Sequence, residues 1–244
     1  MIKINNLTKK YKDKLAVDNL NLEIKTGELF SLLGTNGAGK TTTIKMLSTL
    51  ILPTSGEVEI NNLDLVKDSS KIKEIINISP QETAVASNLT VLENLYFMAG
   101  IYQIPNKENK IKELIKLFKL EEVLKQKAKT LSGGYQRKLS IAISLINNPK
   151  ILFLDEPTLG LDVISRHDLW KVIEALKGKT TIILTTHYME EAEALSDRIG
   201  IMNKGKLIEL GTSKELIKKA KTKNFEDAFI KIIEEDNNEN TNIC

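Results

Sequence analysis

The spacing of apolar residues along the chain alternates between the two-residue period of a strand and the 3.6-residue period of a helix. Residues 2–7, 22–24 and 58–60 alternate apolar and polar side chains, which predicts short strands with one buried face. The clearest strands, by contrast, are continuous apolar runs at residues 29–33, 151–154 and 181–184. Such runs are typical of parallel strands that are covered on both faces.

Helical spacing follows the continuous runs, at residues 39–50, 163–176 and 189–195. Strands that alternate with helices predict an α/β fold with a mostly parallel core sheet, and the half-buried strands predict an antiparallel β subdomain near the N-terminus. Residues 199–210 are expected to form a hairpin whose turn is Asn203-Lys204-Gly205.

One long segment, residues 82–147, departs from this alternation. Residues 91–102, 107–118 and 132–146 have helical spacing, and no strand pattern separates them. We therefore expect a helical subdomain inserted in the α/β core, within a single domain over residues 1–220. Residues 221–244 are expected to form a C-terminal helix and an acidic tail, which is predicted to be disordered from Glu234 because it is Asn-rich and poor in apolar residues.

Composition restricts the possible functions only modestly. The chain of 244 residues is 41% apolar, as expected for a globular protein that buries its core without disulfides or structural metals. A net charge of +3 with well-mixed charges argues against a dedicated nucleic-acid binder. The single cysteine, Cys244, suits a reducing compartment. Since no apolar run reaches the roughly 18–20 residues that span a bilayer, any membrane function is expected to act through a partner.

Residues 34–41 read GTNGAGKT and match the phosphate-loop pattern G-x-x-x-x-G-K-[ST] between a strand and a helix. Backbone N–H groups and the helix N-terminus are expected to bind phosphates, which predicts ATP and Mg²⁺ as ligands. The pattern directs Lys40 to the β and γ phosphates and the Thr41 hydroxyl to Mg²⁺. The residues expected around the phosphates are Asn36, Gly37, Ala38, Gly39, Lys40, Thr41 and Thr42. A chance glycine turn is the alternative, and kinases, GTPases, helicases and transport ATPases all share this loop.

Two adjacent carboxylates, Asp155 and Glu156, follow the apolar strand at residues 151–154. Burying them is costly unless a cation or a proton offsets their charge. Asp155 is therefore predicted to contact Mg²⁺, and Glu156 to orient the attacking water as general base. A solvated acidic turn at a strand end is the alternative.

The pentapeptide LSGGY at residues 131–135 precedes a helical pattern. Ser132 is predicted to be the N-cap, and Gly133 and Gly134 leave the helix N-terminus uncovered, which favours an anion site. A simple cap followed by a tight turn explains the pentapeptide equally well when it is considered alone.

In order along the chain, several motifs resemble the nucleotide-binding domain of an ABC transporter: GTNGAGKTT, Gln81, LSGGYQRK, ILFLDEP, LGLD and His187. The resemblance covers residues 2–211, and LSGG followed by a DEP strand is highly specific to ABC-type ATPases. It implies an ATPase with the P-loop NTPase fold of ABC type. It also implies that Tyr11 stacks on adenine, that Gln81 contacts Mg²⁺ or the lytic water, and that His187 contacts the γ-phosphate. Taken alone, these three would be a surface aromatic, a loop residue and a structural histidine.

Two positions depart from the usual pattern of that family. Tyr135 stands where the family most often has glutamine, and Leu159 stands where a small residue is more usual. Neither change removes a catalytic group, so Ser132 and Gly134 are expected to make the essential phosphate contacts. Asp162 resembles the residue that links two active sites.

Each motif occurs once in the chain. In the family, the signature helix of one subunit completes the phosphate site of another, so the resemblance implies a homodimer or a closely similar partner chain. It also implies integral membrane permease subunits on a separate chain, docked on residues 82–89, and a cytoplasmic position on the inner face of the membrane.

The stretches TLILPTSGEVEI, LTVLENLYFMAGIY and FEDAFIKI resemble the drug, antibiotic and sodium exporter branch of the family. The alternative is a soluble ABC ATPase of translation or DNA repair, but such proteins usually carry two cassettes, a coiled-coil insertion or zinc-binding cysteines. A regulatory module without turnover would lack Glu156 or His187.

Overall fold

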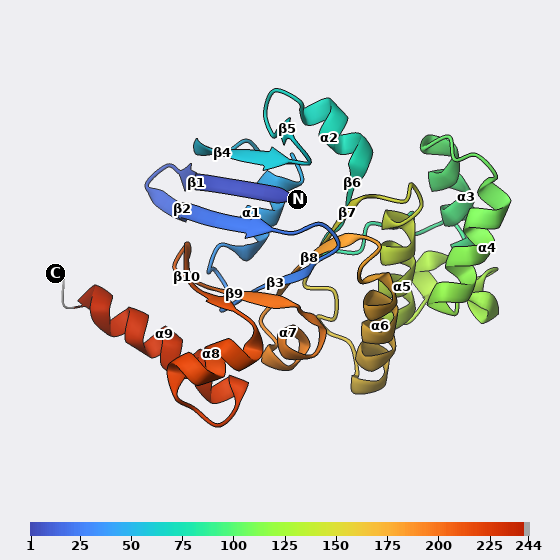
Figure 1. The fold of residues 1–244 in the computed structure, drawn as a ribbon. Coiled ribbons are helices and arrows are strands. Elements are labelled where there is room, and N and C mark those ends of the chain that lie inside the picture. The colour runs from blue at the N-terminus through green and yellow to red at the C-terminus, as the bar shows by residue number, and fades with distance from the viewer. Residues whose placement is uncertain (242–244) are drawn as a thin grey trace.

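The computed structural model describes residues 1–241, and its centre is a six-stranded sheet (Figure 1). The strand order is β10 (Lys206–Gly211), β9 (Arg198–Asn203), β3 (Leu29–Gly34), β8 (Thr181–Thr186), β7 (Ile151–Asp155) and β6 (Ile76–Ser79). The three continuous apolar runs form β3 (Leu29–Gly34), β7 (Ile151–Asp155) and β8 (Thr181–Thr186), which are parallel and buried at every residue. Alternate residues of β7 enter two different hydrophobic clusters. Both faces of the sheet are therefore covered, as the sequence predicts.

A second, antiparallel sheet has the order β2-β1-β4-β5 and contains the N-terminal strands. Its strands are β1 (Ile2–Tyr11), β2 (Lys14–Ile24), β4 (Ser55–Ile60) and β5 (Leu63–Asp64). Strands β1 and β2 are longer than their apolar patterns predict. They form a hairpin whose irregular register passes through Asn6 and Asn19, both at positive φ, so alternation is lost there while the pairing continues.

Strand β6 (Ile76–Ser79) was not predicted from the sequence. It follows α2 (Ser69–Ile75) and lies at the edge of the core sheet, where it pairs with β7. Its sequence, INIS, is half polar, and Asn77 donates a hydrogen bond to the side chain of Asn147 (3.1 Å). A short edge strand with polar residues does not produce the continuous apolar run by which the central strands are recognised.

The helices predicted within residues 82–147 are present and form one end of the molecule, after a loop at residues 82–90 (Figure 1). The segment contains α3 (Val91–Ile101), α4 (Lys107–Phe118), the short 3₁₀ turns Glu121–Val123 and Ala128–Thr130, and α5 (Gly133–Ser144). These helices share one hydrophobic cluster with β7 and β8. The continuous core fixes these helices against the same sheet whose strands lead into the phosphate loop and the Asp155-Glu156 pair.

The remaining helices of the core are α1 (Lys40–Leu47), α6 (Val163–Leu176) and α7 (Met189–Leu195). The predicted hairpin is confirmed as β9 (Arg198–Asn203) and β10 (Lys206–Gly211). Its two-residue turn has positive φ at Lys204 (45°) and Gly205 (86°), the requirement of a type I′ turn.

Helices α8 (Ser213–Ala220) and α9 (Phe225–Thr241) end the described chain. The prediction of disorder from Glu234 is wrong for residues 234–241, which continue α9. Apolar residues such as Phe225 and Phe229 anchor this helix in a hydrophobic cluster, and Asn203 donates a hydrogen bond to Asp236 (2.7 Å). Composition alone could not reveal that anchorage. The predicted tail at residues 242–244, with Cys244, lies outside the described residues.

None of the helices within residues 1–241 has the length and apolar character needed to cross a bilayer.

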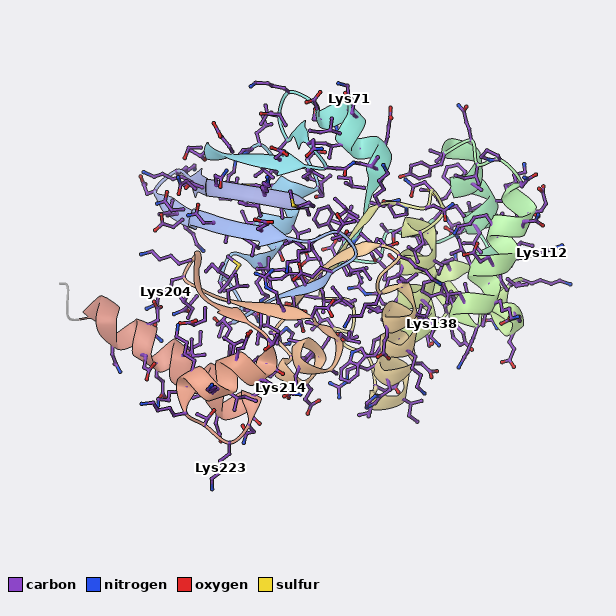
Figure 2. All side chains as sticks on the ribbon, in the orientation of Figure 1. Lys71, Lys112, Lys138, Lys204, Lys214 and Lys223 are labelled. Atoms are coloured by element: carbon purple, nitrogen blue, oxygen red, sulfur yellow. The ribbon has the colours of Figure 1, made fainter. Side chains whose placement is uncertain are left out.

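Lysines are spread over the surface. The six labelled in Figure 2 come from six different segments, among them α2, α4 and α8.

Candidate functional site

A cavity of about 430 Å³ lies over the predicted phosphate loop. Its lining joins the loop to residues that follow β6, β7 and β8, and it includes residues as far apart in the sequence as Lys14 and His187. The lining residues are Lys14, Ala16, Asn36, Gly37, Ala38, Gly39, Lys40, Thr41, Thr42, Gln81, Glu156, Leu159 and His187. The structure thus brings together the whole predicted phosphate set with Gln81, Glu156 and His187.

The loop depends on Gly39, which precedes the first residue of α1. Gly39 has φ 105°, and a Cβ built on it would lie 2.5 Å from the carbonyl oxygen of Ala16. No side chain caps α1. Its first N–H groups therefore remain available at the floor of the cavity, the arrangement that binds anions at a helix N-terminus.

Lys40 places its ammonium group inside the site although the residue is only 5% exposed. Its Nζ donates to the carbonyl oxygens of Gly34 (2.8 Å) and Thr35 (3.2 Å) and lies 3.4 Å from Glu156 Oε1. These acceptors compensate the desolvated charge and fix the amine beside the loop.

Asp155, also buried, accepts two hydroxyl hydrogen bonds at one carboxylate oxygen. Thr41 Oγ1 donates over 3.0 Å and Thr185 Oγ1 over 2.5 Å, both to Oδ1. A threonine hydroxyl beside a carboxylate is a pair of hard oxygen donors of the kind that Mg²⁺ prefers. Two of the three residues predicted to contact the metal, Thr41 and Asp155, therefore adjoin one another and fit it chemically, and the third, Gln81, lines the same cavity.

Glu156 turns its carboxylate into the cavity through an uncommon backbone conformation. Its φ is 49°, in the left-handed region, which is energetically unfavourable for any residue that has a β-carbon. The residue is 6% exposed. Its N–H donates to the carbonyl oxygen of Thr185 (3.1 Å), and its Oε2 lies 2.6 Å from His187 Nδ1. The conformation separates the two adjacent carboxylates, so Asp155 meets Thr41 while Glu156 meets His187.

The sequence did not identify Arg137, whose buried guanidinium group organises the backbone of the site. It donates to the carbonyl oxygens of Pro80 (2.6 Å), Gln81 (3.2 Å), Asp155 (2.8 Å), Glu156 (2.5 Å) and Pro157 (2.7 Å). Burial lowers the pKa of Arg137, and the charge of Asp155 is the largest effect that opposes it. No local motif in the sequence marks this role, because the acceptors are backbone carbonyl oxygens of segments that lie far along the chain.

The signature residues lie elsewhere. Ser132 is the N-cap of α5, as predicted, and its Oγ accepts a long hydrogen bond from the N–H of Tyr135 (3.4 Å). Neither Ser132, Gly133 nor Gly134 lines the cavity, and Ser132 and Gly133 are exposed. Within one chain, the structure does not bring them to the phosphate loop.

Tyr11 also lies outside the cavity lining. Its ring is 46% exposed at the end of β1, with Lys9 Nζ 5.0 Å from the ring centroid. It pairs across the hairpin with Lys14, which does line the cavity. Tyr11 therefore stands beside the site but not within it.

Comparisons with known proteins agree on one family. A family model described as ABC transporter matches residues 17–159. The chain is 43% identical to the human phospholipid-transporting ATPase ABCA3 over 87% of this chain, although it spans only 13% of that protein's length. It is 40% identical to the linearmycin resistance ATP-binding protein LnrL of Bacillus subtilis, over 88% of this chain and 70% of LnrL.

A solved structure similar to this one is an ATP-binding cassette captured as a dimer after hydrolysis, bound to ADP and Pi. It superposes with a TM-score of 0.79 at 30% identity, over 87% of this chain and 98% of that one.

Proposed function

Because the chain belongs to the ABC transporter family, we propose that it is the ATP-hydrolysing subunit that powers a membrane exporter, working as an ATP-driven dimer. The observation that carries the proposal is the cavity in which Glu156 and His187 lie beside Lys40 and the rest of the phosphate loop. Residues 1–220 form the ATPase domain in this proposal, and residues 82–147 its helical insert.

The phosphate loop binds the ATP phosphates through its N–H groups and through Lys40, which exchanges part of its pairing with Glu156 for the β and γ phosphates. Mg²⁺ would be held by Thr41 and Asp155, with Gln81 at the cavity wall, and it would neutralise charge on the phosphates. Thr42 donates to an inner phosphate, and Tyr11 stacks on the adenine from the rim.

Hydrolysis needs a water molecule aligned with the γ-phosphorus. Glu156 accepts one proton of that water while the water oxygen bonds to phosphorus and the bond to the ADP oxygen breaks. His187 orients the carboxylate through its 2.6 Å contact and faces the γ-phosphate. The products are ADP and inorganic phosphate.

A second subunit completes the site. Ser132, Gly133 and Gly134 lie at the N-terminus of α5 and do not line this chain's own cavity, so in a head-to-tail dimer they are available to bind the γ-phosphate held by the other subunit. The partner is a second copy or a close paralogue. ATP then joins the two subunits, and its hydrolysis removes the shared anion and weakens the interface.

Transport requires an integral membrane permease on a separate chain, docked near residues 82–89, which adjoin Gln81. This places the protein in the cytoplasm, on the inner face of the membrane. The export direction draws support from the name of LnrL, an ATP-binding protein of antibiotic resistance, with which this chain shares 40% identity.

The test is phosphate release from ATP by the purified chain, with Mg²⁺ and with EDTA. We expect Mg²⁺-dependent release whose specific rate rises with protein concentration, because two chains form each site. Substituting residues 82–89 should leave this activity and abolish transport by the complex reconstituted with its permease. Absence of hydrolysis, or equal loss of hydrolysis and transport, would contradict the proposal.

A further inference from the structure

Glu191, in the first turn of α7, is a buried carboxyl group to which the mechanism above gives no role. The residue is 0% exposed, and its Oε1 accepts a hydrogen bond from Trp170 Nε1 (3.0 Å). Its Oε2 has no hydrogen-bond partner of standard geometry within residues 1–241, nor does Glu191 form a salt bridge with any of them. A carboxylate in such a place would have no ion-pair partner, and the Arg137 guanidinium, which interacts with it over a longer distance, already donates to five carbonyl oxygens.

Burial and a neighbouring negative charge favour the neutral form of Glu191. Burial raises the pKa of Glu191, and the charge of Glu156 adds to the effect, whereas contacts from Thr186, Thr158 and Trp170 oppose it. The Thr158 hydroxyl oxygen is itself buried and unpaired within the described part of the chain. A protonated Oε2 supplies a donor, which a carboxylate lacks, and can bond to a threonine oxygen.

We infer that Glu191 is a positioning residue of the ATPase site, where its neutral carboxylic acid ties α6 and the loop after Glu156 to the segment that carries His187. The inference rests on the proposed ATPase function. Trp170 belongs to α6, and Thr158 lies two residues after Glu156. Glu191 belongs to α7, which begins two residues after His187, so one carboxyl group reaches three segments that converge on the site.

The contact that benefits is the one between His187 and Glu156, which is formed by the ends of two different strands. Its 2.6 Å length requires those ends to keep a fixed position relative to each other. Glu191 acts on both ends, through Thr158 after β7 and through its own helix α7 after β8. Arg166 provides a second connection between α6 and the residue after His187. Its Cζ lies 5.6 Å from the ring centroid of Trp170 and 5.7 Å from that of Tyr188. Loss of Glu191 should therefore loosen the catalytic pair and leave the phosphate loop unchanged.

The experiment compares steady-state ATP hydrolysis by three variants of the full chain. Glu191→Leu removes both hydrogen-bonding oxygens, and we expect kcat to fall about tenfold while KM for ATP stays within about twofold, the pattern of a lost transition-state contact. Glu191→Gln keeps a neutral group of the same shape and should retain most of kcat. Glu193→Gln, an exposed position of the same helix, is the matched control and should equal the wild type.

Trp170 is the only tryptophan of the chain, so its fluorescence reports directly on this contact. The emission spectrum should shift in Glu191→Leu and stay close to wild type in Glu191→Gln. If the leucine variant does not fold, Thr158→Val replaces it as the test of the inference. This substitution removes one hydroxyl at constant volume, and it should also lower kcat without raising KM.

An unchanged kcat in Glu191→Leu or, if that variant does not fold, in Thr158→Val would overturn the inference. So would a glutamine variant as impaired as the leucine variant, because the charged form would then be the active one. Failure of the proposed function looks different, since the wild type and Glu193→Gln would then also lack hydrolysis.

Discussion

His187 Nδ1 lies 2.6 Å from Glu156 Oε2, while Lys40 Nζ lies 3.4 Å from the other oxygen of the same carboxylate. The carboxylate is thus held between the end of β8 and the start of α1. The left-handed backbone at Glu156 is what directs it there, away from its neighbour Asp155. Strain of this kind, about 1–3 kcal/mol for a residue with a β-carbon, persists where the surrounding contacts enforce it.

Glu156→Gln should abolish ATP hydrolysis while preserving ATP binding. The amide keeps the shape of the side chain but cannot accept a proton from water, so kcat should fall at least about 100-fold. The variant should also accumulate as an ATP-bound dimer, visible by light scattering in the presence of ATP. A hydrolysis rate equal to that of the wild type would show that Glu156 is not the general base.

Gly39→Ala should prevent ATP binding. Its φ of 105° is poor for alanine, and the new Cβ would meet the Ala16 carbonyl oxygen at 2.5 Å. Gly100→Ala is the control, because Gly100 lies in α3, where a Cβ would meet no atom within 4 Å. The control should gain about 0.5–1 kcal/mol in free energy of unfolding. Gly39→Ala should lose stability and show no binding when it is titrated with ATP. Normal ATP affinity in Gly39→Ala would contradict the loop geometry.

Arg137→Leu should destabilise the protein more than any single surface change. It would leave the five carbonyl oxygens that Arg137 binds without that donor in a buried place, at a cost of about 3–5 kcal/mol in free energy of unfolding. Lys112→Gln is the control, since Lys112 points outward from α4 (Figure 2), and it should change stability by less than about 0.5 kcal/mol. Urea unfolding measures both, and equal effects would refute the role of Arg137.

Stability should respond to pH through Glu191. Its folded pKa is raised above the ordinary value of a glutamate, so between that value and the folded pKa the native state binds more protons than the unfolded state. The contribution of Glu191 to stability is therefore present at lower pH and is lost as pH rises through that window. Glu191→Gln removes this pH-dependent contribution. The free energy of unfolding of the variant, relative to that of the wild type, should therefore increase from pH 5 to pH 8. A difference independent of pH would show that Glu191 titrates alike in both states.

Much of the fold could be predicted because its central strands have a simple physical signature. The buried strands β3, β7 and β8 are continuous apolar runs, and the phosphate loop follows the first of them directly. Strand β6 was missed because an edge strand needs no such run. Residues 234–241 were misassigned because their helix is stabilised through tertiary contacts, such as the one between Asn203 and Asp236, that composition does not encode.

The candidate site also contains residues that the sequence identifies and one that it does not. Lys40, Thr41, Asp155 and Glu156 stand in local patterns whose spacing carries their chemistry, and the structure places them around one cavity or beside it. Arg137 acts on backbone carbonyls up to 57 positions away in sequence, so no local spacing identifies it. Its role follows only from packing.

The central claim is that two chains share each hydrolytic site, and mixing two inactive variants tests it directly. Lys40→Ala disables the phosphate loop, and Ser132→Arg disables the signature helix, so each variant alone should lack ATP hydrolysis. A head-to-tail heterodimer of the two contains one intact site, made of the loop of the Ser132→Arg chain and the signature helix of the Lys40→Ala chain. We predict that phosphate release reappears on mixing and approaches about half the wild-type rate per heterodimer, as one site of two is intact. If the mixture stays as inactive as its components, the shared site is contradicted.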